Sequence, residues 1–311
     1  MSDIKLFTLN GENISAELAS GIFAFERDLQ KLIERNMKTI LGINFLDTEY
    51  TTSGEDRGRI DSLDIDENYC PVIIEYKRSY SESIIIQGLF YLDWLMDHKD
   101  AFYRLTMDQL GRDCANKIEW SMPRLFCIAN SFTRYDAHAV KQMNRNIELI
   151  RYKKYDDNIL LIEQVVAGSS NTHISSPEIA QEPQMEAPAA YRTFNEIASE
   201  LDGDLRDLYL AVVDFIENLG DDVQRKELRY YLAFKRLKNF ICLEIRPQVQ
   251  CIRLYLRVNP EDYVDNNGVN GIFRDVSGTG HWGTGDLELT IKNMEDFNQI
   301  QYVLTECYAA N

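Results

Sequence analysis

Several features that would assign a protein to a class at once are missing from this sequence. Its six cysteines are scattered without close pairs and its four histidines are dispersed, so neither a zinc site nor a disulfide framework is expected. No uninterrupted apolar run approaches membrane-spanning length, and residues 1–5 lack the basic start of a signal peptide. We therefore expect a cytoplasmic protein with reduced cysteines and no membrane association.

The chain also lacks an excess of positive charge. It carries 33 basic and 50 acidic side chains, a formal net charge of −17 at pH 7. Proteins that bind nucleic acid usually present a basic surface, because neutralising phosphates releases counterions. Residues 1–167 contain 20 basic and 27 acidic side chains, and residues 191–311 contain 13 and 20, so both parts are acidic. Nucleic-acid binding would therefore need a local basic surface, and a bound metal would offset part of the acidity.

Length and composition indicate a globular protein with two domains. The chain has 311 residues, of which 45% are apolar and 27% charged. Residues 168–190 contain three prolines, no aromatic residue and little apolar periodicity. We predict that this stretch is a flexible linker between a domain at 1–167 and a smaller domain at 191–311.

Apolar spacing predicts an α/β fold for the first domain and an α+β fold for the second. In the first domain the predicted elements are a helix at 15–36, strands at 45–52, 59–66 and 71–78, a long helix at 84–107, a strand at 123–129, a helix at 136–145, and strands at 147–153 and 159–166. In the second they are helices at 194–219 and 293–308, strands at 228–234, 240–245, 251–258 and 287–291, and a glycine-rich loop at 271–285.

The most informative stretch is the hairpin predicted from residues 59–66 and 71–78. Side chains alternate along a strand, so Glu75 and Lys77 project from one face, and Asp61 lies on the adjacent strand. Two carboxylates can bind a divalent cation, and a lysine beside them can orient a water or stabilise negative charge. This combination is suited to phosphodiester hydrolysis.

The same spacing is also compatible with charges on the solvated face of an amphipathic hairpin. The apolar run at 72–74 favours the catalytic interpretation, because it predicts a strand buried on both faces, and charges beside such a strand are costly unless they are used. We expect Asp64 and Asp66 to be turn residues.

With its flanking elements, the region 20–165 resembles the PD-(D/E)XK nuclease superfamily. The resemblance rests on Asp61, on Glu75-Tyr76-Lys77, on the upstream Glu26 and on the stretch from Gln87 to Tyr91. The spacing of Gln87 and Tyr91 resembles the RecB-type branch, and the Gly-Arg-Ile-Asp and Ile-Glu-Tyr-Lys segments resemble NucS-type endonucleases. The resemblance implies a restriction-endonuclease-like core of helix, three strands, helix and strand.

The resemblance also implies roles for individual residues. Asp61 and Glu75 would bind Mg²⁺ or Mn²⁺, and Lys77 would position or activate the attacking water. Glu26 would complete the outer shell of the metal or would be a solvent-facing acid. The candidates for substrate contact are Arg59, which could bind a phosphate, Arg78, and the pair Gln87 and Tyr91, which would contact the substrate, support Lys77 or pack on the sheet.

Two features lie outside this resemblance. NucS-type enzymes carry an N-terminal DNA-binding domain for which we expect no counterpart here, so their specificity is not transferred. The C-terminal region resembles an uncharacterised domain often fused to such nucleases, through residues 230–235, 239–240, 274–276 and 280–283. Its aromatic and basic residues could bind a nucleic acid strand or a partner, or the aromatics could form the domain core.

We therefore expect a metal-dependent deoxyribonuclease, with an endonuclease favoured, that acts in DNA repair or defence. The alternatives are a non-catalytic module that binds nucleic acid or protein, and an RNase with the same core. The sequence leaves open whether the chain is a monomer or a homodimer.

Overall fold

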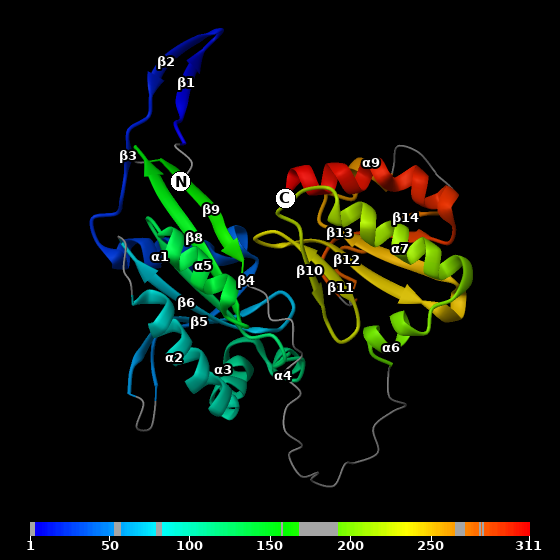
Figure 1. Cartoon of the computed structure of the whole chain (residues 1–311), viewed down its shortest axis with the longest axis horizontal. Helices are drawn as coiled ribbons and strands as arrows, with labels where there is room; N and C mark the ends of the chain where they lie inside the picture. The colour runs from blue at the N-terminus through cyan, green and yellow to red at the C-terminus, as the bar shows by residue number, and fades with distance from the viewer. Residues whose placement is uncertain are drawn as a thin grey trace. The chain divides into compact units, whose positions relative to one another are not determined.

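The chain divides into two compact units, Met1–Glu178 and Ile179–Asn311, in a computed structural model of the protein (Figure 1). The structure describes residues 4–52, 57–78, 83–156, 158–167, 192–264, 271–279, 281 and 283–311. The predicted linker at 168–190 lies outside these residues. The fold is mixed α/β, and no helix in the described ranges is long and apolar enough to cross a membrane.

The first unit contains a two-stranded ribbon and a larger mixed sheet. Its elements are β1 (Phe7–Asn10), β2 (Asn13–Glu17), β3 (Ser20–Gly21), α1 (Glu26–Leu41), β4 (Ile43–Thr51), β5 (Arg59–Asp66), β6 (Pro71–Lys77), α2 (Ile84–Asp97), α3 (Lys99–Leu110), α4 (Arg112–Ala115), β7 (Arg124–Ala129), α5 (Arg134–Gln142), β8 (Asn146–Tyr155) and β9 (Ile159–Ala167). The described strands of the larger sheet run in the order β3-β8-β7-β6-β5-β4, with β9 also paired to β8.

The centre of this sheet is buried on both faces. β4, β5 and β6 pair antiparallel, whereas β6, β7 and β8 pair parallel. Every residue of β7, and all of β6 except its last, is buried, as the apolar run at 72–74 predicts. Ser62 bonds to Glu34 of α1, while the next residue, Leu63, lies in one apolar cluster with Leu95 of α2. Because adjacent side chains point to opposite faces, α1 and α2 cover opposite faces of the sheet.

The helix predicted at 15–36 is wrong in its first part. α1 begins at Glu26, and the preceding residues form strands, because β2 pairs with β1 and Ser20 pairs with Tyr155 of β8. The apolar spacing in this segment resembles a helical stripe, but pairing with other strands determines its structure. α1 ends at Leu41 and is followed by Gly42, whose φ of 69° favours glycine.

The long helix predicted at 84–107 is interrupted at His98, between α2 and α3. His98 has φ −119° and ψ 41°, outside the helical range. Its ring stacks on Trp94 with centroids 4.6 Å apart, and its Nδ1 lies 2.8 Å from the Trp94 carbonyl oxygen. No proline or glycine marks this break, so the sequence pattern alone does not predict it.

The second unit is an antiparallel sheet with helices on one face. Its elements are α6 (Phe194–Ser199), α7 (Gly203–Glu217), β10 (Gln224–Glu227), β11 (Leu232–Lys235), β12 (Asn239–Arg246), the 3-10 turn η1 (Pro247–Val249), β13 (Cys251–Leu256), α8 (Glu261–Val264), β14 (Phe273–Asp275), β15 (Leu287–Ile291) and α9 (Met294–Ala310). The described strands follow the order β10-β11-β12-β13-β15-β14.

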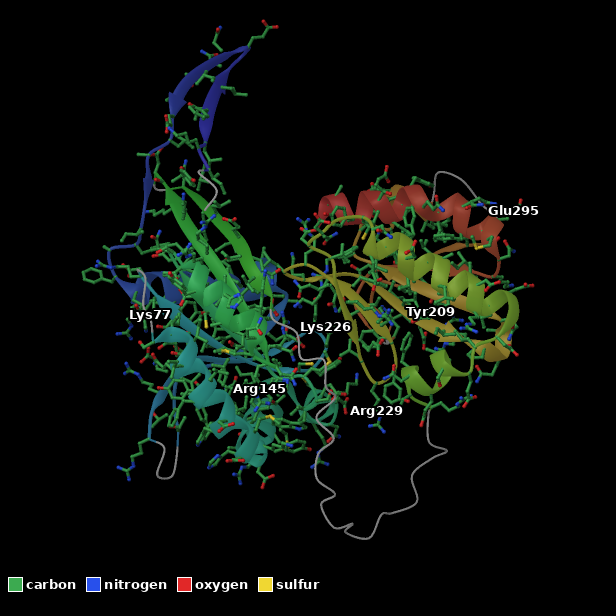
Figure 2. All side chains as sticks on the ribbon, viewed as in Figure 1. Lys77, Arg145, Tyr209, Lys226, Arg229 and Glu295 are labelled. Carbon is green, nitrogen blue, oxygen red and sulfur yellow. The ribbon has the colours of Figure 1, made fainter. Side chains whose placement is uncertain are left out.

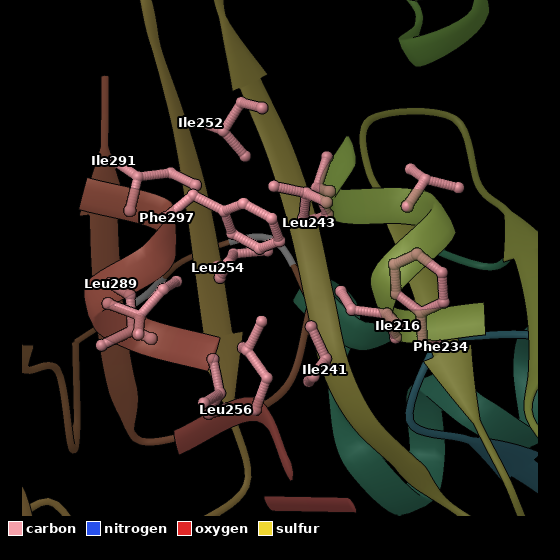
Figure 3. Close-up of a cluster of buried hydrophobic side chains, with 14 of the residues drawn as sticks. Ile216, Phe234, Ile241, Leu243, Ile252, Leu254, Leu256, Leu289, Ile291 and Phe297 are labelled. Atoms are coloured by element: carbon pink, nitrogen blue, oxygen red, sulfur yellow. The ribbon is translucent and has the colours of Figure 1, made fainter. Parts of the chain in front are cut away.

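Apolar side chains of α7 and α9 form the core of this unit with alternate residues of the strands (Figure 3). The helix predicted at 194–219 is divided in two, because Gly203 adopts φ 53° and Asp202 precedes the second helix. The strand predicted at 228–234 is likewise replaced by β10 and β11, which form a hairpin. The predicted loop at 271–285 contains the short strand β14.

A buried ionic cluster joins β5, β7 and β8 in the first unit. Arg124 donates to Asp66 Oδ2 at 2.7 Å and, through Nε, to Glu148 Oε1 at 2.9 Å. Asp66 Oδ1 accepts from the backbone N–H groups of Asn68 and Cys70 at 2.8 and 2.9 Å, which agrees with its expected turn role. The three charged side chains are all buried, so their mutual pairing is what makes their burial tolerable.

Replacing Arg124 by methionine is expected to destabilise the first unit by about 3–5 kcal/mol, because two buried carboxylates would lose their counter-charge. Urea denaturation followed by circular dichroism measures this change. Lys141→Met, at an exposed position on α5, is the matched control and should change the free energy of unfolding by less than about 0.5 kcal/mol. Equal stability of the two variants would contradict the structural role of Arg124.

Candidate active site

Asp61 and Glu75 face each other where β5 and β6 stop pairing. The register of β5 and β6 ends with Ser62 opposite Ile74, and one further step would place Asp61 opposite Glu75. At this point side chains replace the backbone ladder: the Asp61 N–H donates to Glu75 Oε1 at 3.3 Å, and the Tyr76 N–H donates to Asp61 Oδ2 at 3.0 Å. The two carboxylates therefore satisfy backbone donors that the separating strands would otherwise leave unpaired.

The environment of the Glu75 carboxylate disfavours its charge. Glu75 is 0% exposed, and its Oε2 is a buried atom without a hydrogen-bond partner among the described residues. Burial, with a further contribution from the negative charge of Asp61, raises the pKa of Glu75 to about 8. Burial also raises the pKa of Asp61, an effect that the Tyr76 hydrogen bond and the positive charge of Lys77 reduce.

Lys77 is held at the end of β6 by the first residue of α1 (labelled in Figure 2). Its Nζ lies 3.1 Å from Glu26 Oε1 and donates to the Tyr76 carbonyl oxygen at 2.9 Å. The other Glu26 oxygen accepts from the Arg78 N–H at 3.0 Å. These contacts fix the ammonium group of Lys77. Because the side chain is 22% exposed, the group is still accessible to water.

Gln87 and Tyr91 lie on α2, but only Tyr91 is tied to the β5 strand. The Tyr91 hydroxyl accepts from the Arg59 N–H at 3.1 Å. Its ring lies so close to Gly58 that a Cβ there would be 2.5 Å from Tyr91 Cε1. Tyr91 is buried, so in this structure it supports the strand that carries Asp61. Gln87 is partly exposed, and its side chain makes no hydrogen bond with the described residues.

The two arginines predicted to bind substrate are both engaged with neighbouring protein groups. Arg59 is 66% exposed and pairs with Glu49 at 2.6 Å. Arg78 donates through Nη1 to the Ala24 carbonyl oxygen at 2.8 Å, and its own carbonyl accepts from the Tyr152 hydroxyl. Either arginine could contact a phosphate only by giving up these interactions or by using its remaining N–H groups.

The carboxylate pair is chemically suited to a hard divalent cation. Mg²⁺ prefers oxygen ligands, keeps several waters and needs only one or two carboxylates. The unpartnered Glu75 Oε2 beside Asp61 meets this requirement. Within the described ranges no group of three or more His, Cys, Asp and Glu residues could hold a metal, so the remaining ligands would be backbone oxygens or water.

A second polar group lies on the opposite face of the sheet, and its residues were not among the site residues predicted from the sequence. Glu34 Oε1 accepts from Ser62 Oγ at 2.8 Å and from Gln30 Nε2 at 3.0 Å, and Ser62 also bonds to the Tyr76 hydroxyl. Asp64 is fully buried on this face rather than a turn residue, and burial raises its pKa well above the ordinary value. The sequence feature that could have indicated this group is the polar residue at every second position of β5, at Ser62, Asp64 and Asp66.

Comparisons with known proteins give relatives without an assigned function. Residues 195–308 match the family model described as "Domain of unknown function (DUF5655)". An uncharacterized protein of Haemophilus influenzae is 26% identical over 307 residues, covering 97% of each chain. No solved structure matches. The similarity to the Haemophilus protein therefore extends over both units of the chain.

Proposed function

We propose that the protein is a metal-dependent nuclease that hydrolyses phosphodiester bonds of DNA. The observation that carries this proposal is the buried, unpartnered Glu75 Oε2 beside Asp61, at the strand end where Lys77 also lies. A carboxylate oxygen in this position is costly unless it binds a proton or a cation. Mg²⁺ or Mn²⁺, when bound, would supply Lewis-acid activation of the phosphate and of a water.

The residues of the chain would contribute positioning and charge. Asp61 and Glu75 would hold the cation, and their orientation is fixed by the backbone N–H groups of the separating strands. Lys77, held by Glu26 and the Tyr76 carbonyl, would donate a hydrogen bond to the attacking water or to a phosphate oxygen as negative charge develops there. Attack by the water would form one P–O bond and break the P–O bond to the leaving oxygen, so that one product would end in a phosphate and the other in a hydroxyl that has taken up a proton.

The order of elements around the site supports the resemblance to PD-(D/E)XK nucleases. Along the chain, α1, β4, β5, β6 and α2 give a helix, three antiparallel strands and a helix, and β7, which follows α3 and α4, is a strand parallel to β6. The proposed ligands lie on β5 and β6, and Glu26 opens α1. Because the same metal-assisted attack is compatible with a 2′-hydroxyl, RNA remains an alternative substrate.

Asp61→Asn, Glu75→Gln and Lys77→Met are each expected to reduce cleavage at least about 100-fold, because each removes a metal ligand or the charged donor. The assay incubates each protein with single-stranded, double-stranded and branched DNA and with RNA, in Mg²⁺, Mn²⁺ or EDTA. Asp93→Asn, at an exposed position on α2, is the matched control and should retain full activity. No cleavage of any substrate by the unmodified protein, or full activity in the three variants, would contradict the proposal.

The stability of the metal-free protein should fall as the pH rises from about 4.5 towards 8. Glu75 has a raised pKa in the folded state, so the folded protein keeps a proton that the unfolded chain has already lost in this window. Thermal unfolding in EDTA at several pH values measures the effect, and Glu75→Gln should reduce the slope. Mn²⁺ should raise the melting temperature more above pH 8 than near pH 6. An unchanged slope in Glu75→Gln would contradict this assignment.

A further inference from the structure

The outer side of α1 is positively charged. Leu29, Ile33 and Met37 are among the buried residues on the side that faces the sheet. The exposed residues of the helix are those at positions 27, 28, 31, 35, 36, 38 and 39. Four of these seven are basic and one, Asp28, is acidic, so the exposed side has a formal charge of +3. We call the four basic residues the basic stripe of α1: Arg27, Lys31, Arg35 and Lys38.

The spacing of the basic stripe places its charges in a row along the helix. Arg27, Lys31 and Arg35 are four residues apart, so they lie one above another at steps of about 6 Å. Lys38 follows Asn36, whose φ of −121° and ψ of 16° depart from helical geometry, and is exposed as well. Like charges four residues apart repel and slightly destabilise a helix. An anion bound along the row would turn this repulsion into attraction.

The basic stripe has no counter-charge within the described part of the chain. None of its four side chains forms an ion pair or a hydrogen bond with a described residue. The other two acids of α1 have partners elsewhere, because Glu26 pairs with Lys77 and Glu34 accepts from Ser62. The four cations are therefore exposed to water and available to an anionic ligand.

The described helices differ in their content of positive charge, and α1 has the most. It has four basic residues, whereas α3 and α5 have two each, α7 has one, and α2 and α9 have none. The whole chain has a net charge of −17. The outer side of α1 is thus a local basic surface of the kind that binding of a polyanion requires.

The basic stripe begins beside the candidate active site. Glu26, directly before Arg27, accepts from Lys77 Nζ at 3.1 Å. From Arg27 to Arg35 the row extends about 12 Å along the helix axis. One strand of a DNA duplex carries a phosphate about every 3.4 Å of its axis, so this length corresponds to about three or four phosphates.

We propose that the basic stripe of α1 binds the phosphate backbone of a nucleic acid next to the active site, with Lys31 and Arg35 as phosphate contacts. The inference rests on the proposed nuclease function, since it assigns the surface that holds the substrate of that enzyme. The seven exposed residues of α1 include no apolar side chain. A protein partner would be expected to bury apolar groups at the centre of its interface, so a regularly charged polyanion fits this surface better.

The test measures binding of a fluorescein-labelled oligonucleotide to the full chain by fluorescence anisotropy in EDTA. Single-stranded and double-stranded forms are compared at several salt concentrations, with a labelled polyglutamate peptide as a second polyanion. We expect Lys31→Gln/Arg35→Gln to bind at least about tenfold more weakly, and the slope of log K against log salt to fall by about 1.4 for a single strand, because two phosphate contacts are lost. Lys31→Arg/Arg35→Lys keeps both charges and should retain binding.

Arg104→Gln/Lys141→Gln is the matched control, because it removes one arginine and one lysine from exposed positions of α3 and α5. These helices pack in the apolar cluster on the other face of the sheet. The control should bind as the unmodified protein does, and circular dichroism with thermal unfolding establishes that every variant is folded.

Unchanged affinity or salt slope in the folded Lys31→Gln/Arg35→Gln variant, or an equal loss in the control, would overturn the inference. So would lost binding in the charge-preserving variant, absence of binding by the unmodified protein, or equal affinity for polyglutamate. Because EDTA removes the metal, binding that depends on the basic stripe without cleavage in Mg²⁺ or Mn²⁺ contradicts the nuclease proposal alone. Cleavage by a protein whose binding is independent of the basic stripe contradicts this inference alone.

Discussion

The candidate site depends on the separation of β5 and β6 after Ser62 and Ile74. Two paired strands satisfy their own backbone groups, and where they separate those groups need other partners. Here the Asp61 and Glu75 carboxylates accept hydrogen bonds from those backbone groups. The point at which the strand pairing ends therefore determines where the two carboxylates lie. The carboxylates are thereby oriented by main-chain atoms of a buried sheet, which move less than side chains on a surface loop would.

Two groups of buried charges in the first unit have opposite chemical character. Around Arg124, the acids have a counter-charge and several hydrogen bonds, so the cluster is complete without a ligand. At Glu75, one carboxylate oxygen has no partner within the described ranges, and a second acid lies beside it. The buried charges of a satisfied cluster are tolerated by the fold, whereas an unsatisfied acid lowers stability unless it binds a proton or a cation. Asp64, whose two carboxylate oxygens also lack a partner among the described residues, belongs with the unsatisfied acids. This contrast distinguishes the two sets of acids although both lie near β5.

Sequence patterns were sufficient where local signals and burial agree. Strands β5 and β6 could be predicted because alternation, a β-branched run and Pro71 all indicate the same hairpin. Residues 13–21 could not, since pairing with other strands overrode an apolar spacing that resembles a helix. The His98 break depends on packing against Trp94, and the burial of Asp64 depends on how α1 covers the sheet. Such features depend on tertiary contacts that have no local sequence signature.

Net charge is a poor guide to what this protein can bind, because binding depends on the local distribution of charge. At an ionic strength near 0.15 M, interactions between exposed charges are screened beyond about 8 Å. A bound polyanion would therefore be influenced mainly by charges within that distance of it, and little by more distant acids. The distant acids would still weaken long-range attraction of polyanions. For an acidic protein, binding of a polyanion is thus expected to depend on close contacts, with little unspecific attraction.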